Sequence, residues 1–142
     1  MTPSSPHPSM EELKEIYRAT STIAAVGASS DPSKASHRIP AYLQSQGFRI
    51  IPVSPRGGEL FGERVYASLV EVEGPVDVVN VFRPASEAPD IAAQAAKIGA
   101  KVVWLQDGIV SDEAGEVAER AGMTIVMDLC MGTTHARLAF QG

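Results

Sequence analysis

Cysteines, basic clusters and long apolar runs are scarce or missing in this sequence, and each absence excludes a class of protein. The one cysteine, Cys130, allows no internal disulfide and no multi-cysteine metal site, and it fits a reducing compartment. No apolar run reaches the roughly 18 residues of a membrane-spanning helix, so we expect no membrane association. A formal net charge of -5 without a basic cluster argues against nucleic acid as a partner.

The N-terminal sequence MTPSSPHPS is rich in proline and serine and lacks the charged and apolar regions of a secretory signal. We therefore expect a mobile segment over residues 1–9 and a cytoplasmic protein. Ser9 and Glu12 have the spacing of a capping box, which predicts that a helix begins there. We expect residues 10–142 to form one domain, because that length can bury a single core without a disulfide or a metal.

Apolar runs alternate with segments of helical periodicity along the rest of the chain. The runs show no polar alternation, which is typical of strands that are buried on both faces of a parallel sheet. The pattern predicts an α/β domain with a five-stranded parallel sheet between two helix layers, in the strand order 3-2-1-4-5. The predicted strands are 23–26, 48–53, 76–82, 101–105 and 124–128, and the predicted helices between and after them are 36–46, 86–98, 111–121 and 131–140.

The segment IAAVGASSDPSK, residues 23–34, is the strongest functional signal. Its apolar run ends at Gly27, and the small side chains of Ala28, Ser29 and Ser30 would let a ligand approach the backbone amides. Lys34 follows, just before a predicted helix. Backbone donors, a helix N-terminus and a cation together are typical of a phosphate-binding site.

Polar residues also follow the other predicted strands, whose carboxyl ends are where ligands bind in open α/β sheets. Ser54 and Arg56 follow the second strand, Arg83 follows the third, and Gln106 and Gly108 follow the fourth. We therefore expect these residues to face one ligand. The alternative for Arg83 is an ion pair with an acidic side chain at the surface.

The residues after the second strand indicate which nucleotide cofactor fits. An NAD-binding domain has G-x-G-x-x-G after its first strand and an acidic residue after its second, whereas this chain has only Gly27 and then Ser54, Pro55 and Arg56. A guanidinium binds a ribose phosphate through two parallel hydrogen bonds. NADP, with a 2′-phosphate, and coenzyme A, with a 3′-phosphate, both meet this condition, and NAD does not.

Four blocks in combination, VGASSDPSK, IIPVSPRGGE, VDVVNVFRP and VVWLQDGI, resemble the small stand-alone CoA-binding domain proteins. They are similar, more distantly, to the CoA-binding domain of the succinyl-CoA synthetase alpha subunit. The resemblance implies a Rossmann-like, three-layer fold that binds CoA through its ADP moiety. It implies pyrophosphate contacts from Gly27, Ala28, Ser29, Ser30 and Lys34, a 3′-phosphate contact from Arg56, adenosine contacts from Val53, Ser54, Phe82, Arg83 and Pro84, and flanking positions for Pro55, Gln106 and Gly108.

The same comparison argues against catalysis. Succinyl-CoA synthetase phosphorylates a histidine in a domain that follows the CoA-binding one, and this chain ends at Gly142. We expect a non-enzymatic binding module for CoA or an acyl-CoA, with no catalytic residue and no metal. The alternative is an NADP-dependent oxidoreductase or another small nucleotide-using enzyme, but none of Tyr17, Tyr42 and Tyr66 is paired with a lysine at helical spacing to supply a proton.

Two further residues have alternative interpretations. His37, at the start of the second predicted helix, either contacts the phosphate or is solvated. Cys130 follows the last strand, where a buried, inert side chain is the common outcome. The alternative is that its thiol faces the pocket and forms a mixed disulfide with CoA.

Overall fold

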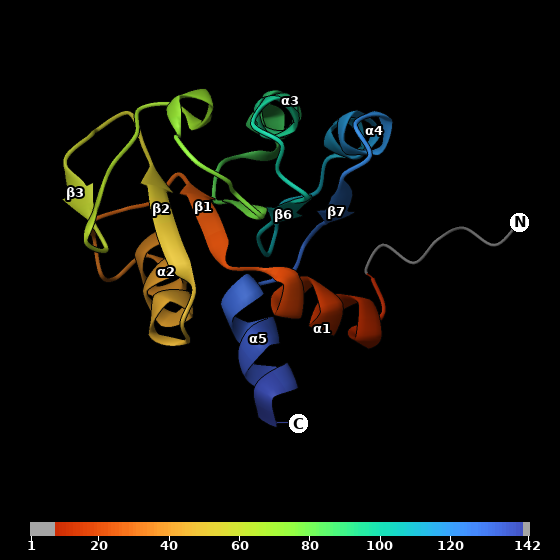
Figure 1. The fold of residues 1–142 in the computed structure, drawn as a ribbon, viewed down its shortest axis with the longest axis horizontal. Helices are drawn as coiled ribbons and strands as arrows, with labels where there is room; N and C mark the ends of the chain where they lie inside the picture. Colours follow the sequence, from red (N-terminus) through yellow and green to blue (C-terminus); the bar gives the residue numbers. More distant parts are fainter. Residues whose placement is uncertain (1–7, 141–142) are drawn as a thin grey trace, which may run out of the picture.

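The computed structural model describes residues 8–140, which form a parallel sheet between two layers of helices (Figure 1). The expected mobile segment falls mostly on residues 1–7, which lie outside the described residues. The five sheet strands are β1 (Thr22–Val26), β2 (Arg49–Val53), β5 (Val78–Val81), β6 (Val102–Leu105) and β7 (Thr124–Val126). The α/β class and the five parallel strands predicted from the sequence are confirmed.

The helices lie close to their predicted positions. They are α1 (Met10–Ala19), α2 (Ala35–Ser45), α3 (Ala88–Lys97), α4 (Asp112–Arg120) and α5 (Met131–Phe140), with short 3-10 helices η1 (Leu69–Glu71) and η2 (Ala85–Glu87). The predicted capping box is present, because Ser9 Oγ accepts from Glu12 N at 3.1 Å and Glu12 Oε1 accepts from Ser9 N at 3.0 Å. In the described part of the chain, no helix has the length and apolar character that a membrane crossing requires.

The strand order differs from the predicted 3-2-1-4-5. The observed order is β2-β1-β5-β6-β7, so the third sheet strand pairs with the first rather than with the second. At its carboxyl end the outer edge of β2 pairs with Tyr66, whose N–H donates to Pro52 O at 3.1 Å and whose carbonyl oxygen accepts from Ser54 N at 2.8 Å. β5 pairs with the other edge of β1.

The two faces of the sheet are covered by different helices. Figure 1 shows α1, α2 and α5 on one face and α3 and α4 on the other. Each face has its own cluster of buried apolar side chains. The first includes Ile23, Leu43, Val78, Trp104 and Met131, and the second includes Ala24, Val79, Ile91, Val103 and Ala118.

This arrangement creates a switch point between β1 and β5. From β1 the chain passes through α2 to β2 on one side, whereas from β5 it passes through α3 to β6 on the other. Phe82 N donates to Val26 O at 2.9 Å, so the carboxyl ends of the two strands adjoin. In open α/β sheets the crevice at such a point is where ligands bind.

His135 of α5 lies in an aromatic cluster and should make the fold sensitive to acid. Its ring centroid is 5.1 Å from that of Tyr17 and 5.5 Å from that of Phe48, and Tyr42 Oη lies 3.0 Å from its Nδ1. Burial lowers the pKa of His135. Because the unfolded chain then binds a proton at higher pH than the folded chain, we expect stability to fall as the pH drops below about 6.5.

Urea unfolding at pH 7.5 and pH 5.5 measures this effect. The stability lost between the two pH values should shrink in His135→Phe, which has no titrating group at this position. An equal loss in both proteins would show that other groups cause the pH dependence.

Candidate functional site

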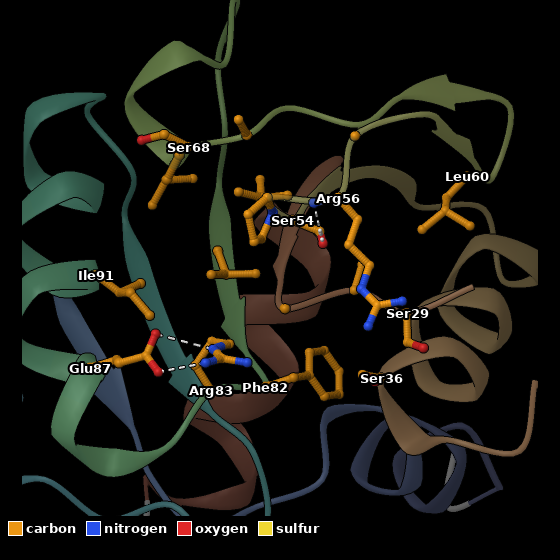
Figure 2. Close-up of a pocket in the computed structure, with 18 of the residues that line it drawn as sticks. Ser29, Ser36, Ser54, Arg56, Leu60, Ser68, Phe82, Arg83, Glu87 and Ile91 are labelled. Carbon is orange, nitrogen blue, oxygen red and sulfur yellow. Dashed lines mark hydrogen bonds and ion pairs between the residues drawn. The ribbon is translucent and has the colours of Figure 1, made fainter. Parts of the chain in front are cut away.

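A cavity of about 900 Å³ lies over the carboxyl ends of β1, β2 and β5 (Figure 2). Its walls come from the loop after β1, the segment after β2, η1 and the first half of α3. The volume falls within the range of small-molecule sites. The cavity brings together most of the predicted site residues: Gly27, Ala28, Ser29, Ser30, Lys34, Val53, Ser54, Pro55, Arg56, Phe82 and Arg83.

Three predicted site residues lie outside this cavity. Pro84 is exposed and stands at the start of η2. Gln106 is buried, and its Oε1 accepts from Met131 N at 2.8 Å, which ties it to the start of α5. The backbone N–H of Gly108 donates to Asp128 Oδ1 at 2.7 Å and is therefore already bonded.

The loop between β1 and α2 is shaped by its own side chains. Ser29 Oγ accepts from Asp31 N at 3.0 Å, and Asp31 Oδ1 accepts from Ser33 N at 2.9 Å. Hydrogen bonds from the backbone and side chain of Ser33 lower the pKa of Asp31. The Asp31 carboxylate therefore stays charged and serves the turn.

Several amides of this loop remain available to a ligand. Across residues 8–140, the N–H groups of Ala28, Ser30, Ala35 and Ser36 donate to no protein acceptor. The last two belong to the first turn of α2, whose dipole favours negative charge at this end. These four donors, together with Lys34, can bind an anion.

Arg83 crosses directly over Gly27. A Cβ added to Gly27 would lie 2.8 Å from Arg83 Cδ, so any other residue here would force this side chain to move. Beyond that point the guanidinium forms a double hydrogen bond with Glu87, Nε to Oε1 at 3.1 Å and Nη2 to Oε2 at 2.7 Å. This bond raises the pKa of Arg83 and lowers the pKa of Glu87. The charge of Arg83 is thus matched by an acidic neighbour.

Arg56 differs from Arg83 in this respect. Its backbone N–H donates to Ser54 Oγ at 3.3 Å, which orients the turn after β2. In Figure 2 its side chain extends toward Ser29, and within the described part of the chain its guanidinium forms no ion pair. Arg56 and Lys34 therefore bring positive charge to the wall that carries the available amides, where Asp31 and Glu59 are acidic neighbours.

Sequence reasoning missed one wall of the cavity. The sequence predicts an irregular connection over residues 60–74 with one helical turn around 68–72, and η1 matches that turn, but β3 (Glu59–Leu60) and β4 (Glu63–Arg64) form a short hairpin that it does not predict. The hairpin and the segment after it place Leu60, Ser68 and Leu69 on the cavity wall, and α3 adds Asp90 and Gln94. Strands of two residues are too short to leave a periodic signal in the sequence.

A second cavity, of about 500 Å³, shares Ser36 and Phe82 with the first, and Cys130 lies on its wall. Burial tends to raise the pKa of the Cys130 thiol, but hydrogen bonds with Thr133, Gln106 and the Gly132 backbone outweigh it and leave the pKa lowered. His37 is on the wall of neither cavity. Its Nδ1 lies 2.8 Å from Ser29 O, so it supports the loop.

A parallel sheet flanked by helices, with a polar cavity at its switch point, defines a Rossmann-like domain. Comparison with known families is more specific, because residues 21–136 match the family described as "CoA binding domain". The chain therefore belongs to the CoA-binding domain family.

Similar proteins include stand-alone chains and parts of larger enzymes. The chain is 40% identical to the uncharacterized protein YneT of Bacillus subtilis over 92% of its own length and 96% of that protein. A solved structure from Thermus thermophilus is 41% identical, with a TM-score of 0.88 over 92% of this chain and 99% of that one. Acetate–CoA ligase [ADP-forming] II subunit alpha of Pyrococcus furiosus is 31% identical over 82% of this chain, which spans only 28% of that subunit.

Proposed function

We propose that this protein binds coenzyme A, free or acylated, through its ADP moiety, as a binding module without a reaction of its own. Membership of the CoA-binding domain family and the likeness to part of a CoA ligase subunit support a CoA ligand. The observation that carries the proposed binding mode is the cavity wall where unpaired backbone amides lie with Lys34 and Arg56.

Each phosphate of CoA has a candidate partner on that wall. The amides of Ala28 and Ser30 and the first turn of α2 would hold the pyrophosphate, with Lys34 supplying charge. Arg56, which has no ion pair among the described residues, would bind the 3′-phosphate through charged hydrogen bonds. Val53, Ser54, Pro55 and Phe82 would then lie along the adenosine.

The residues that line the cavity favour a CoA-binding function over an NADP-dependent redox reaction. Its described lining includes no tyrosine, histidine or cysteine, and its one lysine, Lys34, lies on the wall proposed for the phosphates. Tyr17 Oη donates to Met131 O at 2.7 Å, and Tyr42 Oη lies 3.0 Å from His135 Nδ1, so both hydroxyls have partners away from this cavity. The cytoplasmic location and the lack of a nucleic-acid partner stay predictions from the sequence.

Isothermal titration with CoA, dephospho-CoA, NADP and NAD at one salt concentration tests the proposal. We expect CoA to bind much more tightly than dephospho-CoA, because the two differ only in the 3′-phosphate. CoA should also bind more tightly than NADP, and NAD should bind weakly. Binding of NADP with no heat from CoA would overturn the proposal and place the protein among the oxidoreductases.

A further inference from the structure

The cavity has a second end whose chemistry differs from that of the phosphate end. Figure 2 shows Ser68 and Ile91 on one side of the cavity and Ser29 and Ser36 on the other. We call the former side the α3 end and define it by Ser68, Leu69, Asp90, Ile91 and Gln94. Leu69 and Ile91 are core residues, 2% and 5% exposed, and they form the apolar floor of this end with little accessible area.

The charges at the α3 end disfavour a phosphate. Asp90 is acidic, and the neighbouring Glu87 already neutralises Arg83, so no free cation is found at this end among residues 8–140. The cations Lys34 and Arg56 come from the loops after β1 and β2 instead. A ligand whose phosphates bind these loops therefore presents an uncharged group to the α3 end.

The Gln94 side chain is held in one orientation by two neighbours. Its Nε2 donates to Asp90 Oδ2 at 2.8 Å, and its Oε1 accepts from Ser68 Oγ at 3.2 Å. A carboxylate only accepts, so Asp90 fixes which atom of the amide faces it. An amide has two N–H donors and two acceptor positions. Gln94 therefore keeps one donor and one acceptor for a ligand.

A ligand that donates to Oε1 and accepts from Nε2 would complement the two positions that Gln94 keeps, and adenine can do both. A glutamine amide pairs with adenine in two places, by accepting from the N6 amine and donating to the adjacent ring nitrogen. We propose that Gln94 selects adenine in this way, with the ring packed against Leu69 and Ile91. This inference rests on the proposed function, because it assigns the base of the same CoA molecule.

The inference also predicts which bases are rejected. Guanine and hypoxanthine carry a carbonyl oxygen at position 6, which would face Gln94 Oε1, and two acceptors repel. It further moves the base away from Pro84, which the sequence resemblance had placed beside the adenosine but which lies outside the cavity.

Titration with two ligand pairs tests the role of Gln94. The first pair is CoA and 1,N6-etheno-CoA, in which a bridge removes the N6 hydrogens. The second is ADP and IDP, which differ at position 6 of the base. We expect each adenine form to bind about 5- to 150-fold more tightly than its partner, the range typical of such a bidentate contact. In Gln94→Met, which keeps the side-chain length, both ratios should fall to near one.

Lys97→Met is the matched control, because it changes an exposed residue of the same helix that is not on the cavity wall. Lys97→Met should keep both affinity ratios, and the circular dichroism spectrum of each variant should match that of the unchanged protein. Equal affinity for the members of each pair in the unchanged protein would overturn the inference while CoA binding stands. Ratios that persist in Gln94→Met would also overturn it. An unchanged protein that binds no CoA would overturn the proposed function as well.

Discussion

Arg56→Ala is expected to weaken CoA binding by about 1.5 to 3 kcal/mol and to leave dephospho-CoA binding unchanged. The 3′-phosphate is the only group that distinguishes the two ligands, and a charged hydrogen bond to it has no counterpart in dephospho-CoA. The substitution should not unfold the protein, because Arg56 forms no ion pair with the other described side chains. Titration calorimetry of the variant with both ligands measures the difference.

Arg64→Ala provides the control for lost charge. Arg64 belongs to the nearby hairpin, but its guanidinium lies 4.5 Å from the ring centroid of Tyr66 and is not on the cavity wall. This variant should lose little CoA affinity, and what it loses should disappear at high salt. If Arg56→Ala weakens CoA and dephospho-CoA equally, Arg56 does not bind the 3′-phosphate.

The sequence was sufficient for the local features of the site. The loop around Gly27 was predictable because an apolar run, a glycine and small residues leave a local signature, and the same holds for the turn at Ser54 and Arg56. These segments do meet at one cavity. Membership of the CoA-binding domain family, inferred from the four sequence blocks, is confirmed by the family match.

Features that depend on distant pairing were not predictable from local patterns. The strand order depends on which strand pairs with the second edge of β1, and the apolar pattern of β5 does not specify its neighbour. The sequence left two alternatives for Arg83, a ligand contact or an ion pair, because a ligand and Glu87 would bind the same guanidinium. Gln94 was not predicted as a site residue, because the sequence pattern of α3 indicates a helix but does not indicate which side of it lines the cavity.

Gly27→Ala is expected to destabilise the protein by about 1 to 3 kcal/mol, for two separable reasons. Gly27 has φ +91°, a left-handed conformation that costs a residue with a side chain about 1 to 2 kcal/mol. The new methyl group would also lie 2.8 Å from Arg83 Cδ, so the half-exposed Arg83 side chain must move and lose its ion pair with Glu87, which costs up to about 1 kcal/mol. Urea unfolding measures the sum.

Two further variants separate these contributions. Gly74 has a similar φ of +85° with nothing within 4 Å of an added Cβ, so Gly74→Ala should show only the backbone cost. Removing the Arg83 side chain should relieve the contact, so Gly27→Ala should cost less in an Arg83→Ala background than in the unchanged protein. Arg83→Ala alone should cost little, because its ion pair with Glu87 is about half exposed. If Gly27→Ala lowers stability equally in both backgrounds, the contact with the Arg83 side chain does not contribute to its effect.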